Sequence, residues 1–474
     1  MNASIRRTAV VASILFLALL VNVSIVQLWR QSSLSADNRN RRVLDAEFAQ
    51  NRGAILAGDT QIATTTPIKD RFRYQRSYPQ GSLYATVTGW YAYDFGRSGL
   101  EAKYSTELAG TASNQTIDRL VDLFTGATPV GATIQTTINP KLQQVAAQQL
   151  SGKKGAVVAL DPKTGAILAM VSTPTYDPNT LATHDLAAAR AAWTALNADP
   201  AKPLSDRATR EIYPPGSTFK LVTAAAALES GMTPDTLLNT PSQLTLPNSS
   251  SVLGNESNCG NTQQTMDRAL QLSCNTAFAN LGATLGADKI RAQAKKFGFD
   301  STPMTDINAA KSQFPSKADA AQTMLSAIGQ YDVAASPLQM AMVAAAICND
   351  GVLKTPYLVS EVRSPDLRVL YRHGPDDKQA MSAASAQALQ QMMVNVVQKG
   401  TGTKAQVGGV VVGGKTGTAQ TDPTKNPYAW FVSFAKNPDI AIAVFIEDAN
   451  VDRTDIAGGA LAGPIAKAII QASR

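Results

Sequence analysis

The segment Pro214-Pro215-Gly216-Ser217-Thr218-Phe219-Lys220 places a serine three residues before a lysine. The alanine-rich run Leu221 to Leu228 follows and predicts a helix whose first turn carries both residues. Residues three apart share one face of a helix, so the two side chains can meet. A serine hydroxyl needs a base to become a nucleophile, and lysine can serve when burial and neighbouring charge lower its pKa. The pair alone proves little, because Ser-x-x-Lys occurs by chance in many proteins and an exposed first turn also explains it.

Two later segments change this interpretation. Leu272-Ser273-Cys274-Asn275-Thr276 and Gly414-Lys415-Thr416-Gly417-Thr418 follow in order along the chain. A trio of this type is the signature of penicillin-binding proteins and related β-lactamases. The sequence therefore resembles the penicillin-binding proteins, over roughly Thr133 to the C-terminus. Further segments that look like the transpeptidase domain of this family are Asp206-Arg207-Ala208, Gly329-Gln330, Ser336-Pro337-Leu338-Gln339 and Trp430-Phe431-Val432.

The resemblance implies a role for each motif residue. The catalytic residues would be Ser217 as nucleophile, Lys220 as its base and Ser273 as a proton relay to the leaving amine. The substrate-binding residues would be Asn275 for an amide, Lys415, Thr416 and Thr418 for a carboxylate, and Gly417 for close backbone approach. The backbone NH groups of Ser217 and Thr418 would form the oxyanion hole. On a strand, Thr416 and Thr418 face away from Lys415, so a bulge or local twist would be needed to present all three.

The Lys-Thr-Gly segment also has a competing interpretation. Gly409 to Thr416 formally satisfies the phosphate-loop pattern of nucleotide-binding proteins. A phosphate loop follows its strand and opens a helix, whereas here β-branched Val410 to Val412 occupy the loop positions and Pro423 and Pro427 come after them. We therefore predict a strand here and no nucleotide site.

Composition sets further limits. The 474 residues, with 44% hydrophobic content, predict more than one domain. The net charge of +7 is modest and scattered except at Arg39 to Arg42, which indicates a surface near anionic lipid or wall polymer and no nucleic-acid partner, although a solvated face explains it equally well. The two histidines, His184 and His373, give no metal-ligand spacing, so we predict no metal and no organic cofactor.

The N-terminal part predicts a membrane anchor. Ala9 to Trp29 is an apolar run of about the 20 residues that a membrane-spanning helix requires. Arg6 and Arg7 precede it, which predicts a cytoplasmic tail at residues 1–8 and the bulk of a single-pass protein outside the cell membrane. A cleaved signal peptide is the alternative, but the run is long and Gln27 to Arg30 lacks the small residues of a cleavage site.

Residues 30–132 form a predicted non-catalytic module, with a β-like run at Leu83 to Val87. Asn51-Arg52-Gly53-Ala54-Ile55 and Gly99-Leu100-Glu101 resemble the N-terminal module of the same family. The region is too short for a glycan-polymerising domain, so the resemblance is to the monofunctional, class B proteins, and the small module suggests an actinobacterial member.

Residues 133–474 are the predicted transpeptidase domain, with an α+β fold in which an antiparallel sheet packs against helices. A hairpin is predicted from two apolar runs around Asp161 to Gly165. Other predicted elements are a strand at Ala132 to Thr137, a helix at Pro140 to Leu150, strands at Val407 to Val412, Trp430 to Ala435 and Ile440 to Ile446, and a helix at Ala457 to Ala472. Of three cysteines, Cys259 and Cys274 are close enough in sequence to bridge, with Cys348 left in an apolar run; the sequence does not settle the connectivity.

The family resemblance implies a peptidoglycan D,D-transpeptidase. Ser217 would attack the penultimate D-alanine carbonyl of a stem peptide ending in D-Ala-D-Ala, terminal D-alanine would leave, and an amine of a neighbouring stem peptide would form the cross-link. β-Lactams would acylate Ser217. The expected partners are stem peptides, the membrane, and a membrane glycan polymerase with division or elongation proteins. The sequence identifies neither the acceptor amine nor the cellular process.

The alternatives are hydrolytic enzymes and a sensor. A D,D-carboxypeptidase or a β-lactamase would use water as the acceptor. A class A β-lactamase needs a deacylating glutamate, and none occurs between Glu256 and Glu361. Class D-like hydrolysis through a carboxylated lysine is harder to exclude. A membrane β-lactam sensor ranks last, because a tail of about eight residues before Ala9 holds no signalling domain.

Overall fold

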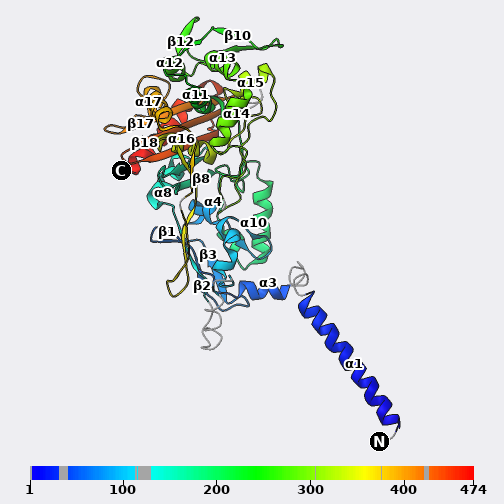
Figure 1. Cartoon of the computed structure of the whole chain (residues 1–474). Coiled ribbons are helices and arrows are strands. Elements are labelled where there is room, and N and C mark those ends of the chain that lie inside the picture. The colour runs from blue at the N-terminus through cyan, green and yellow to red at the C-terminus, as the bar shows by residue number, and fades with distance from the viewer. Residues whose placement is uncertain are drawn as a thin grey trace.

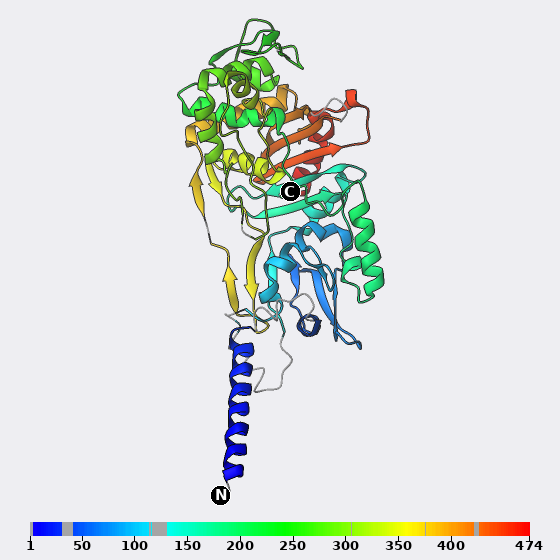
Figure 2. The ribbon, with the colours of Figure 1, turned by 90° about the vertical axis from the view of Figure 1, so that its right-hand side faces the viewer.

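The computed structural model describes residues 3–30, 41–112, 115, 130–304, 306–374, 376–420 and 426–474. Helix α1 (Ala3–Leu28) stands away from the body of the molecule (Figures 1 and 2) and none of its residues is buried. Its 26 residues make a rod of about 39 Å, long enough for a hydrocarbon core of about 30 Å. It is therefore a candidate membrane span. Arg39 of the predicted cationic cluster lies outside the described residues.

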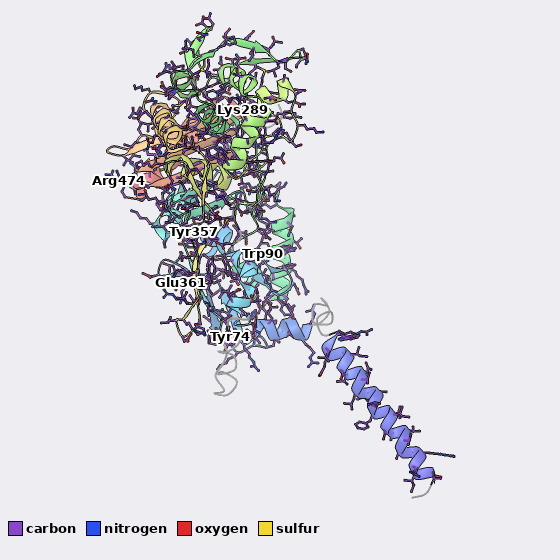
Figure 3. All side chains as sticks on the ribbon, viewed as in Figure 1. Tyr74, Trp90, Lys289, Tyr357, Glu361 and Arg474 are labelled. Atoms are coloured by element: carbon purple, nitrogen blue, oxygen red, sulfur yellow. A yellow bond between two sulfur atoms is a disulfide. The ribbon has the colours of Figure 1, made fainter. Side chains whose placement is uncertain are left out.

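Beyond α1 the molecule has two parts, which we call the lower body and the upper body from their places in Figure 1. The lower body contains a six-stranded sheet in the order β15-β14-β6-β1-β2-β3. Strands β1 and β6 run parallel, and the other neighbours are antiparallel. A late hairpin thus joins the first strands of the chain. Figure 3 shows Glu361 of this hairpin at a height between Trp90 and Tyr74, far below Lys289. The strands are β1 (Ile55–Ala57), β2 (Thr60–Pro67), β3 (Tyr74–Ser77), β6 (Thr133–Thr136), β14 (Val359–Arg363) and β15 (Val369–Arg372).

A buried ionic triad lies in the N-terminal module. Glu101, in α5 (Gly99–Lys103), is fully buried and accepts hydrogen bonds from Arg52 at 2.8 Å and Arg76 at 2.6 Å. The Arg52 guanidinium also lies 4.1 Å from the centre of the Tyr91 ring. The two segments that resemble the family module therefore meet at one carboxylate.

The β-like run predicted at Leu83 to Val87 is wrong. This segment is helical, as η1 (Gly81–Tyr84) and α4 (Ala85–Thr88). Short apolar runs do not distinguish strand from buried helix, and here Tyr84 and Val87 are buried on a helical turn. Gly89, with φ +68°, ends the turn.

The upper body is organised around a five-stranded antiparallel sheet, β17-β18-β19-β7-β8. The predicted hairpin is confirmed as β7 (Lys154–Leu160) and β8 (Ile167–Thr173). The remaining strands, β17 (Val411–Ala419), β18 (Tyr428–Lys436) and β19 (Ile440–Asp448), appear orange to red in Figure 1. The α+β fold is thereby confirmed.

Helices cover both faces of this sheet. Val157 and Ala159 pack in one cluster with α8 (Pro140–Gln149) and α19 (Gly463–Ala472). Ala156 and Val158, which alternate with them, share a second cluster with α16 (Pro337–Cys348) and α11 (Lys220–Glu229). The helix predicted at Ala457 to Ala472 is divided into α18 (Gly458–Leu461) and α19.

The other elements complete the two bodies. The helices are α3 (Arg41–Phe48), α6 (Ser105–Leu108), α9 (Asn179–Ala182), α10 (Leu186–Ala198), η3 (Gly216–Phe219), α12 (Met266–Gln271), α13 (Asn275–Leu285), α14 (Ala287–Lys296), α15 (Ala320–Ser326), α17 (Ala383–Lys399), η4 (Thr403–Ala405) and η5 (Arg453–Asp455). The short strands are β4 (Tyr91–Ala92), β5 (Gly96–Arg97), β9 (Leu237–Asn239), β10 (Gln243–Thr245), β11 (Val252–Gly254), β12 (Gln263–Thr265), β13 (Val352–Lys354) and β16 (Asp377–Gln379).

Candidate active site

The Ser-x-x-Lys segment lies at the start of α11. The predicted helix begins at Lys220, and Ser217 lies in the preceding 3-10 turn η3. Side chains three apart eclipse each other in a 3-10 helix, so the shift from the predicted α-helical turn keeps both residues on one side. Lys220 is fully buried and Ser217 is half-buried. The serine is therefore the member of the pair that solvent and substrate can reach.

The two motif lysines meet at the Ser-x-Asn segment. Lys220 Nζ donates to Ser273 O and to Asn275 Oδ1, both at 2.7 Å, and lies 3.4 Å from Ser273 Oγ. Lys415 Nζ donates to the same Ser273 Oγ at 2.8 Å. Three segments that lie far apart in sequence thus form one hydrogen-bonded cluster.

The Ser217 hydroxyl is not part of this cluster. Among the described residues, its oxygen makes no hydrogen bond, and the Lys220 amine is held by Ser273 and Asn275. The sequence places the base beside the nucleophile, and the structure places it between the nucleophile segment and the Ser-x-Asn segment. Catalytic hydrogen bonds are often long or absent before substrate binds, so this geometry does not argue against the pair.

Burial changes the protonation of both amines. Burial, followed by the nearby charge of Lys415, lowers the pKa of Lys220 well below its usual value, while Glu256 opposes the shift. Burial also lowers the pKa of Lys415 to about 7, again against the effect of Glu256. An uncharged Lys220 can accept a proton at neutral pH, as the sequence interpretation requires.

The Ser-x-Asn segment is fixed at its centre by a disulfide. Cys274 is bonded to Cys259, with 5.9 Å between their Cα atoms, which resolves the connectivity that the sequence left open. Cys348 is free and buried. Ser273 has a left-handed backbone with φ +60°, which costs free energy for a residue other than glycine. The bridge and the hydrogen bonds to Lys220 hold it there.

Strand β17 carries the Lys-Thr-Gly segment without the bulge considered from the sequence. It pairs with β18 in continuous register from Val411–Lys436 to Ala419–Tyr428. Thr416 Oγ1 lies 2.6 Å from Thr401 Oγ1, so the two hydroxyls share a hydrogen bond. The Thr416 side chain is thus on the opposite face of the strand from Lys415. Its expected contact with a substrate carboxylate gains no support from this geometry and stays a prediction, as does that of Thr418.

Glycines allow the nucleophile segment to approach β17 closely. A Cβ on Gly417 would lie 2.9 Å from Thr218 Cγ2 and 3.1 Å from Pro215 O. Gly216, with φ +51°, donates its NH to Gly329 O at 3.0 Å. The close approach at Gly417 is thus to the segment that carries Ser217. Strand β17 and the turn that carries Ser217 form one wall of the site.

Two of the supporting family segments contact the loop that carries Ser217. Trp430 Nε1 donates to Pro214 O at 3.1 Å. Gly329 has φ +73°, and a Cβ there would lie 2.2 Å from Gly216 O. These segments therefore hold the backbone around Ser217 and do not reach the reacting atoms themselves.

Sequence reasoning missed three neighbours of the motifs. Gly254 O accepts a hydrogen bond from Asn275 Nδ2 at 3.1 Å, and Asn255 is bonded to Thr276. Thr401 is the partner of Thr416. Nothing in the local sequence marks these residues, because they reach the site only through the long-range fold.

A separate cavity of about 400 Å³ lies between the module and the upper body. Trp90 and Ala102 line one side, and Tyr176 and Asp206 line the other. No residue of the Ser-x-x-Lys, Ser-x-Asn or Lys-Thr-Gly segments lines it, so it is distinct from the candidate active site.

Comparison with known proteins agrees with this geometry. Residues 155–471 match the model of the penicillin-binding protein transpeptidase domain, and residues 52–134 match that of the penicillin-binding protein A dimerisation domain. The chain is 43% identical to the peptidoglycan D,D-transpeptidase PbpA of Mycolicibacterium smegmatis and 42% identical to that of Mycobacterium tuberculosis, covering 100% of this chain and 99% of each relative.

Solved structures give the same result. The chain is similar to penicillin-binding protein A from M. tuberculosis as its ceftriaxone acyl-enzyme complex, with a TM-score of 0.86, 39% identity, and 90% of this chain and 99% of that chain covered. Its similarity to the penicillin G acyl-enzyme complex gives a TM-score of 0.85 at 40% identity, with the same coverage. The predicted resemblance to an actinobacterial class B protein is confirmed, and the chain belongs to the penicillin-binding protein transpeptidase family.

Proposed function

We propose that this chain is a peptidoglycan D,D-transpeptidase that uses Ser217 as its nucleophile. The observation that carries the proposal is the meeting of Lys220 and Lys415, both fully buried, at the single hydroxyl of Ser273. The names of the relatives and the β-lactam acyl-enzymes of the structural neighbours support the same chemistry.

In the acylation step, uncharged Lys220 takes the proton of the Ser217 hydroxyl. The Ser217 oxygen then attacks the penultimate D-alanine carbonyl of a stem peptide, and the backbone NH groups of Ser217 and Thr418 bind the oxyanion. Loss of one such donor costs roughly 10²–10³ in rate. The C–N bond breaks, and the proton passes from Lys220 through Ser273 to the departing D-alanine.

The acyl-enzyme is resolved by an amine of a second stem peptide. The amine forms a new C–N bond, and its proton returns to the Ser217 oxygen as the ester bond breaks. Asn275 binds the amide of the donor, and Lys415 supplies positive charge for its carboxylate. Thr416, Gly417 and Thr418 complete that wall of the site. No metal or organic cofactor takes part in these steps.

The chain is proposed to be a single-pass membrane protein with residues 1–8 in the cytoplasm and 9–29 in the membrane. Residues 30–132 are assigned to the non-catalytic module and 133–474 to the catalytic domain outside the membrane. The length of α1 supports the anchor. Strand β6 and the β14–β15 hairpin belong to residues 133–474 but lie in one sheet with β1, β2 and β3 of residues 30–132. One sheet therefore crosses this boundary. A membrane glycan polymerase with division or elongation proteins is the proposed protein partner.

The rival function is hydrolysis, as a D,D-carboxypeptidase or a class D-like β-lactamase. A direct test incubates the detergent-solubilised full chain with a D-Ala-D-Ala stem peptide and an amine acceptor, and separates the products by mass. Cross-linked peptide that disappears in Ser217→Ala supports transpeptidation. Shortened peptide alone would make the chain a carboxypeptidase. Cross-linking that survives in Ser217→Ala would move the nucleophile elsewhere.

A further inference from the structure

The loop from Gly254 to Cys259 lies directly against the Ser-x-Asn segment. Its first residue accepts a hydrogen bond from Asn275, and its last is the disulfide partner of Cys274. Between them, Asn255 Oδ1 accepts from Thr276 N and Asn255 Nδ2 donates to Thr276 Oγ1, both at 3.0 Å. The loop is therefore attached to three consecutive residues of the catalytic segment.

Glu256 is the acidic residue of this loop. It follows Asn255 directly, so its Cα lies about 3.8 Å from that of a residue bonded to the motif. Its side chain is exposed. Among the residues that the structure describes, it forms no ion pair and no side-chain hydrogen bond.

The charge of Glu256 nevertheless reaches the site. It raises the pKa of both Lys220 and Lys415, although burial outweighs this effect for each amine. Glu256 is exposed, whereas both amines are fully buried. A second substrate can therefore meet its carboxylate in solvent, beside the Ser-x-Asn segment to which the loop is bonded.

We propose that Glu256 selects the acceptor amine by charge. This inference rests on the proposed transpeptidase function. An exposed carboxylate beside the Ser-x-Asn segment attracts an ammonium group and repels a carboxylate next to that ammonium. The preferred acceptor is therefore a cationic amine whose neighbouring carboxyl group is absent or neutralised as an amide. Glu256 acts on the approach and binding of the acceptor.

The protons balance in this scheme. The bound ammonium first releases one proton to water and becomes the free amine. Its nitrogen then bonds to the acyl carbon, and the Ser217 ester C–O bond breaks. The second proton of the nitrogen passes to the Ser217 oxygen, which restores the hydroxyl.

Glycinamide and glycine provide a matched pair of acceptors for the test. The two differ in the carboxylate next to the amine. The full chain would receive a D-Ala-D-Ala stem peptide as donor, and the ratio of glycinamide to glycine adducts would be measured by mass. Comparing this ratio between variants cancels the difference in basicity of the two amines. Removing one charge at a distance of a few Å in a solvated site should lower the ratio roughly five-fold in Glu256→Gln, and Glu256→Lys should lower it further.

Asp235→Asn is the matched control, because Asp235 is also an exposed carboxylate and neither motif lysine responds to its charge. Its adduct ratio should equal that of the wild type. Penicillin should still label Glu256→Gln, which checks that the site is folded. Any change in its labelling rate reflects the effect of Glu256 on the two lysines and changes both adducts alike. An unchanged ratio in Glu256→Gln and Glu256→Lys would overturn the inference, as would an equal loss of both adducts. Absence of any adduct in the wild type would instead contradict the proposed transpeptidase function.

Discussion

Lys220 and Lys415 both direct their amines at Ser273, at 3.4 Å and 2.8 Å from its Oγ. A hydroxyl can accept two hydrogen bonds and donate one. Because both acceptor positions face lysines, the Ser273 proton is left to point toward a third group. The leaving amine of a substrate is such a group. This geometry supports the proposed role of Ser273 as a proton relay from Lys220 to the leaving amine.

Ser273→Ala removes the relay and leaves both buried amines without that acceptor. The acylation rate with penicillin should fall roughly 10²–10⁴-fold, the range of general acid–base effects. The rate is measured by labelling with fluorescent penicillin and quenching the reaction at a series of times. Ser273→Thr keeps a hydroxyl and should recover part of the rate. Equal loss in both variants would mean that packing and not the hydroxyl is responsible.

The pH dependence of acylation should follow the two lysines. Burial lowers the pKa of Lys220, so the uncharged base forms as pH rises and the rate climbs. Lys415 loses its positive charge above a pKa of about 7, so attraction for the substrate carboxylate declines there. The second-order acylation constant of the free enzyme should thus rise and then fall with pH.

Two variants separate the limbs of this profile. Lys220→Arg keeps a permanent charge and should reduce acylation by more than about 10³-fold at every pH. Lys415→Gln should be slower but should lose the falling limb. A falling limb that persists in Lys415→Gln would show that another group causes it.

The Cys259–Cys274 bridge links the Glu256 loop to the Ser-x-Asn segment. Its residues are 15 apart in sequence, and a loop of this size corresponds to about 3 kcal/mol of stabilisation. Cys259→Ser should lower the free energy of unfolding by about this amount and slow penicillin acylation, because Ser273 loses support for its left-handed backbone. Thermal unfolding and labelling rates measure both effects.

Cys348→Ala is the control for the loss of a thiol without the loss of a bridge. Cys348 is buried but unpaired, so its replacement should cost about 1 kcal/mol or less. Similar losses in both variants would show that the bridge itself adds little.

The local features of the site were predictable because spacing along a helix or a strand determines which side chains share a face. Ser217 and Lys220 are three apart, and the β-branched run Val410 to Val412 predicts a strand that continues through Lys415 in β17. The alternation of Lys415 and Thr416 across that strand was also predicted. What the alternation could not show is that Thr416 has its own partner in Thr401, 15 positions away.

Long-range contacts set the limit of the prediction. The β14–β15 hairpin pairs with β6, more than 200 residues earlier, and nothing in the local pattern of either segment selects the other. Glu256 likewise lies in a polar loop with no local signal of a function. Only the folded structure, through the disulfide, brings its loop against the Ser-x-Asn segment. The run at Leu83 to Val87 failed for another reason, since apolar runs of this length fit both strand and helix.

Glu101→Gln should destabilise the N-terminal module. Removing the carboxylate charge leaves the guanidinium groups of Arg52 and Arg76 buried without their counter-ion, which costs about 3–5 kcal/mol. Asp59→Asn, an exposed acid in the same module, should have almost no effect. The free energy of unfolding at neutral pH measures the difference, and equal stability of the two variants would contradict the prediction.

The stability difference between wild type and Glu101→Gln should also depend on pH. Burial alone would raise the pKa of Glu101, but Arg76 and Arg52 lower it below its usual 4.5. Since the folded value is lowered, this stabilisation is present above about pH 4.5 and is lost as pH falls through the folded value. The stability difference between wild type and Glu101→Gln should therefore shrink in acid. A difference that stays constant with pH would assign the loss to packing.

Gly329→Ala should disable acylation through the backbone. A methyl group there would lie 2.2 Å from Gly216 O, so the turn that carries Ser217 must shift. Gly231→Ala is a close control, because Gly231 also has a positive φ, +89°, but no atom within 4 Å of the added carbon. Both substitutions strain the backbone, by roughly 1 kcal/mol. Only Gly329→Ala should also slow penicillin labelling, by at least about ten-fold, since a displacement of about 1 Å can cost 10²-fold in rate. If both variants lose stability but label at the wild-type rate, the contact between Gly329 and Gly216 does not position the nucleophile.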